Sequence, residues 1–96
     1  MFNIPADVNQ LVENAGNPEA GLAPKGSVQS RTDFGKTGYG GACPPKGDKP
    51  HRYHFTVYAL NTDKLPLDAD APGAMVGFYI NNHKLAQASI TMIYGR

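Results

Sequence analysis

The segment Gly38–Leu60 constrains the fold of this chain most strongly, because a loop rich in glycine and proline runs directly into a strand pattern. Residues 51–60 are dominated by aromatic and β-branched residues, which favour strands. Side chains alternate between faces along a strand, so His51 and Tyr53 share one face with Phe55, Val57 and Ala59. The segment therefore predicts a strand over His51–Leu60, with a small polar site at one end of a buried apolar sheet face.

Length and composition predict one loop-rich domain. The chain has 96 residues, enough for a single modest core. Its 11 glycines and 8 prolines make 19, and 14 of these lie within residues 1–50. Regular structure should therefore be concentrated in the C-terminal half. We expect a mainly β domain with a few short helices over residues 1–96.

Further elements follow from local patterns. Alternation at Ala88, Ile90, Met92 and Tyr94 predicts a second strand over Lys84–Tyr94. Between the strands, Asp68 or Asp70 can cap a helix with Pro72 in its first turn, ending near Asn81–Asn82. In the N-terminal half, we expect one or two helical turns within Ala6–Asn14 and a short extended segment at Ser27–Phe34.

Charge is distributed unevenly along the chain. The net charge is only +1, but residues 25–52 contain six basic and two acidic residues, whereas residues 1–24 contain three acidic and no basic ones. This local positive charge favours an anionic ligand, the alternative being scattered solubilising charges. The patch is too small and too mixed to predict nucleic-acid binding.

The cysteine count and the apolar segments of the sequence bear on the cellular compartment of the protein. A single cysteine, Cys43, cannot form an intrachain disulfide, which agrees with a reducing compartment. The sequence shows neither an apolar run of about 20 residues nor the pattern of a signal peptide. We therefore expect a soluble cytoplasmic protein without a transmembrane segment.

The loop and the strand that follows it supply candidate ligands for an anion. Consecutive glycines let the backbone N–H groups of Gly40, Gly41, Ala42 and Cys43 converge as a nest, and Pro44 and Pro45 would stiffen its far side. His51 and Tyr53 can both donate hydrogen bonds to the same anion. The alternatives are an ordinary connecting loop and a histidine that only packs at the end of a strand.

Two other kinds of chemistry are weaker alternatives. Cys43 could act as a nucleophile with His51 as its base, but nothing in the sequence supplies a third group. His54 points to the opposite face from His51, and His83 is most simply a turn residue, so no metal site is predicted. We expect a non-enzymatic protein without a cofactor.

The run Gly-Tyr-Gly-Gly-Ala-Cys-Pro-Pro-Lys-Gly-Asp-Lys-Pro-His-Arg-Tyr-His-Phe at residues 38–55 resembles a signature block of the phosphatidylethanolamine-binding protein family. The resemblance is greatest to the bacterial, Raf-kinase-inhibitor-like branch. It extends to residues 2–5, to residues 30–35, and to the closing residues 88–96. It therefore covers almost the whole chain.

The resemblance implies a β-rich fold around a large sheet, with a small surface pocket for phosphate-like anions and phospholipid headgroups. His51 and Tyr53 match the histidine and tyrosine of that pocket, while Gly41, Pro44 and Pro45 match its loop wall. The alternative that some relatives suggest is a protein-interaction regulator, inhibiting a kinase or a protease.

One family block does not appear in this sequence. The family's Asp-Pro-Asp-x-Pro stretch normally precedes the segment that resembles Phe2–Pro5. The sequence is therefore expected to represent a truncated, C-terminal part of the family domain, with an incomplete ligand site. Because unpaired strand edges and uncovered apolar surface would result, we expect a homo-oligomer.

Overall fold

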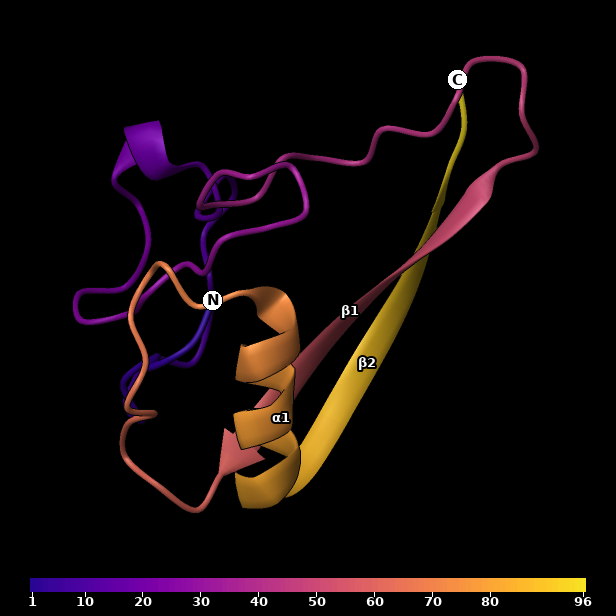
Figure 1. Cartoon of the computed structure of the whole chain (residues 1–96). Coiled ribbons are helices and arrows are strands. Elements are labelled where there is room, and N and C mark those ends of the chain that lie inside the picture. Colours follow the sequence, from indigo (N-terminus) through magenta and orange to yellow (C-terminus); the bar gives the residue numbers. More distant parts are fainter.

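The computed structural model describes residues 1–96, and its regular structure lies in the C-terminal half, as expected. Strand β1 (His51–Leu60) pairs antiparallel with strand β2 (Lys84–Tyr94), and the two form a two-stranded sheet. Both predicted strands are confirmed to the residue. Figure 1 shows them as a long twisted ribbon that projects away from the loops of the N-terminal half. A large sheet, as the resemblance implied, is absent from these residues.

The register places most of the large apolar residues on one side of the ribbon, whereas Tyr58 and Ile93 lie on the other side. Phe55 faces Ile90, and Tyr53 faces Met92, whereas the smaller Val57 faces Ala88. We call this side the apolar ribbon face, which consists of the β1 residues Tyr53, Phe55, Val57 and Ala59 and the β2 residues Ala86, Ala88, Ile90, Met92 and Tyr94. On the opposite, polar side, hydroxyl and imidazole groups bond across the strands.

The apolar ribbon face is exposed, which corrects the prediction of a buried sheet face. The exposed fractions are 44% for Phe55, 64% for Val57 and 62% for Ile90. Tyr39 reaches this face from the loops and meets the edge of the Phe55 ring at a centroid distance of 6.1 Å. A two-stranded ribbon has no second layer of its own, so the alternating pattern that forms the strand cannot by itself bury one face.

Helix α1 (Gly73–His83) connects the two strands. The predicted helix exists, but its caps differ from the expectation. Pro72 is the N-cap, and the Asp68 carboxylate instead accepts a hydrogen bond from the Asp70 N–H in a turn before the helix. At the other end, the chain passes from His83 into the extended backbone of Lys84 without a left-handed residue.

The N-terminal half contains little regular structure. Its only helix is a single 3-10 turn at Pro18–Ala20, so the helical turns predicted within Ala6–Asn14 are wrong. Left-handed backbone at Asn14 is incompatible with a continuing helix there. Ser27–Phe34 forms no strand, but Val28 bridges Phe2, and Arg31 bridges Thr37 and Pro72.

The hydrophobic core is small and joins the N-terminus to the helix. Its buried members are Phe2, Leu65, Ala71 and Val76, and Leu60 and Ile80 pack against them among other half-buried residues. The side chain of Asn3 holds this junction, because its amide oxygen accepts from the Leu65 N–H at 2.7 Å while its amide nitrogen donates to the Leu65 carbonyl. The core therefore joins the N-terminus to α1 and contacts the ribbon only at the Leu60 end of β1.

None of the helices combines the length and the apolar character that crossing a bilayer requires.

Candidate anion-binding site

His51 and Tyr53 lie at the beginning of β1, where the ribbon is farthest from α1 (Figure 1). Their ring centroids are 6.4 Å apart with an interplanar angle of 30°, and both residues are half-buried. His51 is paired with Tyr94 and Tyr53 with Met92 at the end of β2. The predicted pair therefore lies on one face, at the end of the ribbon to which the glycine-rich loop connects.

Asp48 is a member of this site that the sequence did not single out. The imidazole Nε2 of His51 lies 2.8 Å from the Asp48 carboxylate oxygen Oδ2. The hydrogen bond from His51, together with one from the Lys49 backbone N–H, lowers the pKa of Asp48 below its ordinary value. In the sequence, the only signal for this contact was the spacing of three residues between Asp48 and His51. That signal is weak, because the side chain of a turn residue before a strand usually faces solvent.

We expect His51→Gln to raise the pKa of Asp48 toward its ordinary value, because the main hydrogen-bond donor to the carboxylate changes. The pKa of Asp48 is lower in the folded protein than in the unfolded chain. The contact therefore stabilises the fold fully above about pH 4, the ordinary pKa of aspartate, and this stabilisation is lost as the pH falls through the folded-state pKa. NMR titration of the Asp48 side-chain carboxyl carbon measures the change. An unchanged pKa in the variant would show that His51 does not bind Asp48.

The backbone of the loop offers unused donors. No acceptor in the protein lies within hydrogen-bonding distance of the N–H groups of Gly40, Gly41, Ala42 and Cys43. Gly41 has a φ of 86°, in the left-handed region that a nest requires of one of its residues. The predicted loop donors are therefore free to bind an anion.

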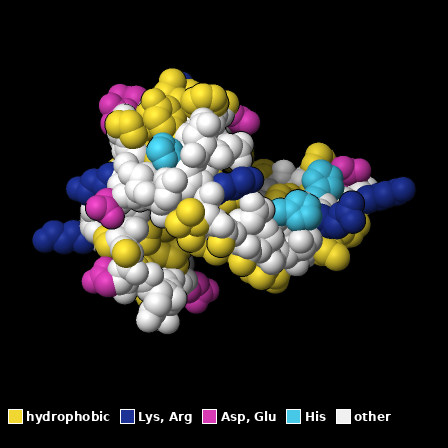
Figure 2. Space-filling model, turned by 90° about the horizontal axis from the view of Figure 1, so that it is seen from below, with side chains coloured by type: hydrophobic (Ala, Val, Ile, Leu, Met, Phe, Trp, Pro, Cys, Tyr) yellow, Lys and Arg dark blue, Asp and Glu magenta, His cyan; other side chains and the backbone are white.

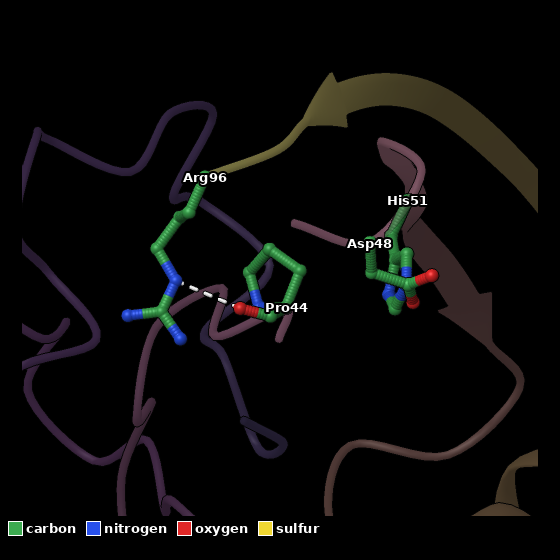
Figure 3. A network of polar contacts seen from close by, with 4 residues as sticks. All are labelled: Pro44, Asp48, His51 and Arg96. Atoms are coloured by element: carbon green, nitrogen blue, oxygen red, sulfur yellow. Dashed lines mark hydrogen bonds and ion pairs between the residues drawn. The ribbon is translucent and has the colours of Figure 1, made fainter. Parts of the chain in front are cut away.

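Pro44 and Pro45 follow these donors and fix the end of the loop. Pro44 is among the most buried side chains of the protein. Its carbonyl oxygen accepts a hydrogen bond of 2.7 Å from Nε of Arg96, and the Gly47 N–H donates to the Arg96 carbonyl. Figure 3 shows the Arg96 guanidinium pointing at the Pro44 carbonyl, while Asp48 turns toward His51. The segment after β2 therefore holds the loop that precedes β1.

Arg96 is the second site residue that the sequence did not single out. It belongs to the stretch that resembled the family, but its distance of 52 residues from Pro44 gave no local signal for the contact. Gly95 beside it allows the close approach, because a side chain there would meet Pro50 at 3.3 Å. Strand pairing brings these two segments to the same end of the ribbon, and the hydrogen bonds of Arg96 with Pro44 and Gly47 join them there.

Some of the basic residues lie at the same end of the molecule as this site, and others lie at the opposite end. Lys46, Lys49 and Arg96 form no ion pair with any carboxylate; the contact between His51 and Asp48 is an ion pair when the imidazole is protonated. In Figure 2, histidine and basic side chains lie together at the end where β1 begins. Part of the local positive charge expected from the sequence therefore lies at the site, together with the Asp48 carboxylate.

The structure does not bring the predicted nucleophile and base together. The Sγ atom of Cys43 lies 3.6 Å from Nη2 of Arg96, whereas the His51 imidazole bonds to Asp48. Cys43 therefore has no general base. His54 bonds to Thr91 and His83 to Asn61, and no group of three metal-ligating side chains occurs.

An open cavity of about 670 Å³ lies against part of the same loop. Gly40 and Cys43 line it together with Thr32, Phe34, Lys36 and Tyr39, among others, whereas His51 and Tyr53 do not. The site residues predicted from the sequence therefore do not surround one enclosed pocket. They form an open surface site at the end of the ribbon.

Comparison with known proteins identifies relatives across almost the whole chain. The family model described as phosphatidylethanolamine-binding protein matches residues 1–95. The UPF0098 protein YbcL of Escherichia coli K12 is 53% identical over 94 residues, covering 98% of this chain and 51% of that protein. YbhB of the same organism is 51% identical and is covered over 58% of its length.

The fold is similar to that of a solved relative. The crystal structure of E. coli YbcL, described as a new member of the mammalian PEBP family, superposes with a TM-score of 0.92 at 52% sequence identity. The match covers 98% of this chain and 57% of that structure. This chain spans between half and three fifths of the length of these relatives. The chain belongs to the phosphatidylethanolamine-binding protein family.

Proposed function

We propose that the chain is a non-catalytic module that binds a phosphate-like anion, such as a free phosphate or the headgroup of a phospholipid. His51, Tyr53 and the backbone N–H groups of Gly40, Gly41, Ala42 and Cys43 provide the ligands, and Pro44 and Pro45 hold the end of the loop. The observation that carries this proposal is the row of four backbone N–H groups without acceptors, next to basic side chains that form no ion pairs. Such donors bind anions strongly because both the dipoles and the charges favour a negative group.

The binding proposal is favoured over catalysis by the arrangement of the side chains. Cys43 has a cation beside it but no base, and His51 is held by a carboxylate. A polarised donor surface without an activated nucleophile is suited to holding an anion rather than to attacking a substrate. The proposal of a regulator that binds a kinase or a protease has no contact in this structure that favours it.

The binding proposal is tested by NMR with inorganic phosphate, phosphoethanolamine and glycerophosphoethanolamine, the last being the soluble form of a phospholipid headgroup. We expect millimolar phosphate to shift the amide resonances of Gly40, Gly41 and Cys43 and the ring resonances of His51. His51→Ala should weaken binding about tenfold, since it removes the Nδ1–H that a protonated His51 can donate beside its bond to Asp48.

His54→Ala is the matched control, because His54 lies on the opposite face of β1 and bonds to Thr91. This variant should bind phosphate as tightly as the original protein. The absence of shifts with any of the three compounds at millimolar concentration would contradict an anion site. Equal weakening in both variants would contradict the role of His51.

We also propose that the apolar ribbon face packs against the same face of a second copy. Large side chains lie at the Tyr94 end of this face, and alanines lie at the end marked by Ala59 and Ala86. A two-fold axis near Ile90, which is more exposed than Phe55 beside Tyr39, would place the large end of one copy against the small end of the other. Sheets pack about 10 Å apart, so such a size gradient is self-complementary.

Charge and area also agree with a second copy as the occupant. The residues that define the apolar ribbon face include no charged one, so their contact between two copies involves no repulsion; His51 and Asp48 lie just beyond its Tyr94 end. A large aromatic side chain buries about 150–250 Å², and the half-exposed large residues together offer on the order of 500 Å² per copy. Two copies would therefore remove about 1,000 Å², the lower limit for a specific interface.

A further inference from the structure

We propose that Arg96 is a direct ligand of the anion and that its charge makes the site prefer a dianionic phosphate group over a monoanionic one. The inference rests on the proposed function of the site and adds both a residue and a ligand class. It follows from the donors that Arg96 leaves unused, from the charge balance around His51, and from the way that the loop fixes the guanidinium.

The guanidinium of Arg96 has hydrogen-bond donors that no acceptor in the protein uses. An arginine side chain carries five N–H bonds. Nε uses its single N–H on the Pro44 carbonyl, and Nη2 makes one long contact of 3.6 Å to Cys43. Nη1 has no acceptor in the protein, so both of its N–H bonds and one on Nη2 remain free. The Nη1–Nη2 edge can therefore bind two oxygens of a phosphate group side by side.

The orientation of the guanidinium is fixed before any ligand binds. The bond from Nε to Pro44 sets its plane, and the Gly47 N–H holds the backbone of Arg96 at a distance of 3.2 Å. Pro44 directly follows the four loop residues whose N–H groups lack acceptors. The free edge of Arg96 and the free loop donors are therefore parts of one connected surface.

The charge balance explains why the site needs Arg96. A protonated His51 is offset by its own ion-pair partner, Asp48, so the pair brings no net positive charge to an anion. Lys46 and Lys49 are exposed on the loop and have long side chains that no contact holds in place. Arg96 is the basic side chain near the loop donors that is both permanently charged and held by hydrogen bonds.

A dianion gains most from this arrangement. A phosphate monoester carries a charge of about −1.5 to −2 at neutral pH, whereas the phosphodiester of a phospholipid headgroup carries a single charge. The Coulomb attraction to a fixed guanidinium scales with the charge of the ligand. Arg96 should therefore raise the affinity for a monoester more than the affinity for a diester.

Arg96 could instead act only by holding the loop, through its bond to Pro44. A purely structural role would weaken both ligand classes equally, because both use the same loop donors. The ratio of the two affinities therefore separates a ligand from a clamp. Arg96→Lys adds a second distinction, since lysine keeps the charge but lacks the planar fork that reaches Pro44 and the anion together.

The experiment measures the affinities of phosphoethanolamine and of glycerophosphoethanolamine by NMR titration at pH 8, where the monoester is a dianion. We expect Arg96→Ala to weaken phosphoethanolamine about tenfold or more and glycerophosphoethanolamine only a few-fold, so the preference for the monoester is lost. Arg96→Lys should weaken both but keep most of the preference. Arg52→Ala is the control, because Arg52 lies on β1 but on the opposite face from His51.

The outcomes separate this inference from the proposed function. If Arg96→Ala binds both compounds as the original protein does, or loses both equally, Arg96 is not the ligand that selects a dianion. The anion site still stands in that case, provided that His51→Ala weakens binding. If the original protein binds neither compound, the proposed function and this inference fall together. A loss of preference in Arg52→Ala would show that general surface charge sets the preference.

Discussion

Replacing Ile90 by lysine is expected to convert a dimer of this protein into monomers. Ile90 lies near the proposed two-fold axis, opposite Phe55, and 62% of it is exposed in the single chain. Each dimer would bury two ammonium groups close together in an apolar interface, and an unpaired buried charge costs several kcal/mol. Light scattering at high micromolar concentration measures the mass directly.

The matched control for this substitution is Gln87→Lys. Gln87 lies three residues earlier on β2 and faces Tyr58 on the polar side of the ribbon. Lysine there adds the same charge without entering the apolar ribbon face, so the mass should not change. A monomeric mass for the unsubstituted protein would contradict self-association, and dissociation by both substitutions would contradict the assignment of the face.

Replacing Phe2 by alanine is expected to destabilise the protein by about 3 kcal/mol or more, since it removes a buried aromatic side chain. Phe2 is 4% exposed and packs in the core cluster with Leu65, Ala71 and Val76. Domains of this size are stable by only about 5–15 kcal/mol, so the loss is a large part of the total. Equilibrium unfolding in urea measures the change.

Phe34→Ala serves as the control, because this substitution removes the same atoms as Phe2→Ala but from a side chain that is 66% exposed. We expect this variant to change the free energy of unfolding by less than about 0.5 kcal/mol, as surface substitutions usually do. Equal losses in the two variants would show that the small core does not hold the N-terminal half to α1.

The strands could be predicted from the sequence because their signal is local. Alternation over ten residues or more fixes both the element and the face of each side chain, and it placed His51 and Tyr53 on one face correctly. Burial could not be predicted in this way, because it depends on what packs against the ribbon. The prediction that an aspartate caps α1 was also wrong, because the Asp68 carboxylate accepts a hydrogen bond from the Asp70 N–H before the helix begins.

The loop half of the site was predictable from its glycines, but its supports were not. Arg96 reaches Pro44 only because the strands place residues 44 and 96 at the same end of the ribbon. Asp48 reaches His51 through the shape of the turn between them. The first contact follows from tertiary geometry and the second from the conformation of one turn, and neither is encoded by periodicity. The roles of all these residues in binding stay predictions.

The direct passage from α1 into β2 has a consequence for how the ribbon opens. The Asn61 N–H donates to the His83 carbonyl and the Asn61 side chain bonds to His83, so this end of the strand pair is pinned beside the core. The opposite end is secured mainly by Gly47, Pro44 and Arg96. The strand pairs near Asn61 should therefore form first, and those near His51 should open first. A bound anion would hold this end of the ribbon closed. Occupancy of the site should therefore lengthen the lifetime of the strand pairs nearest to His51.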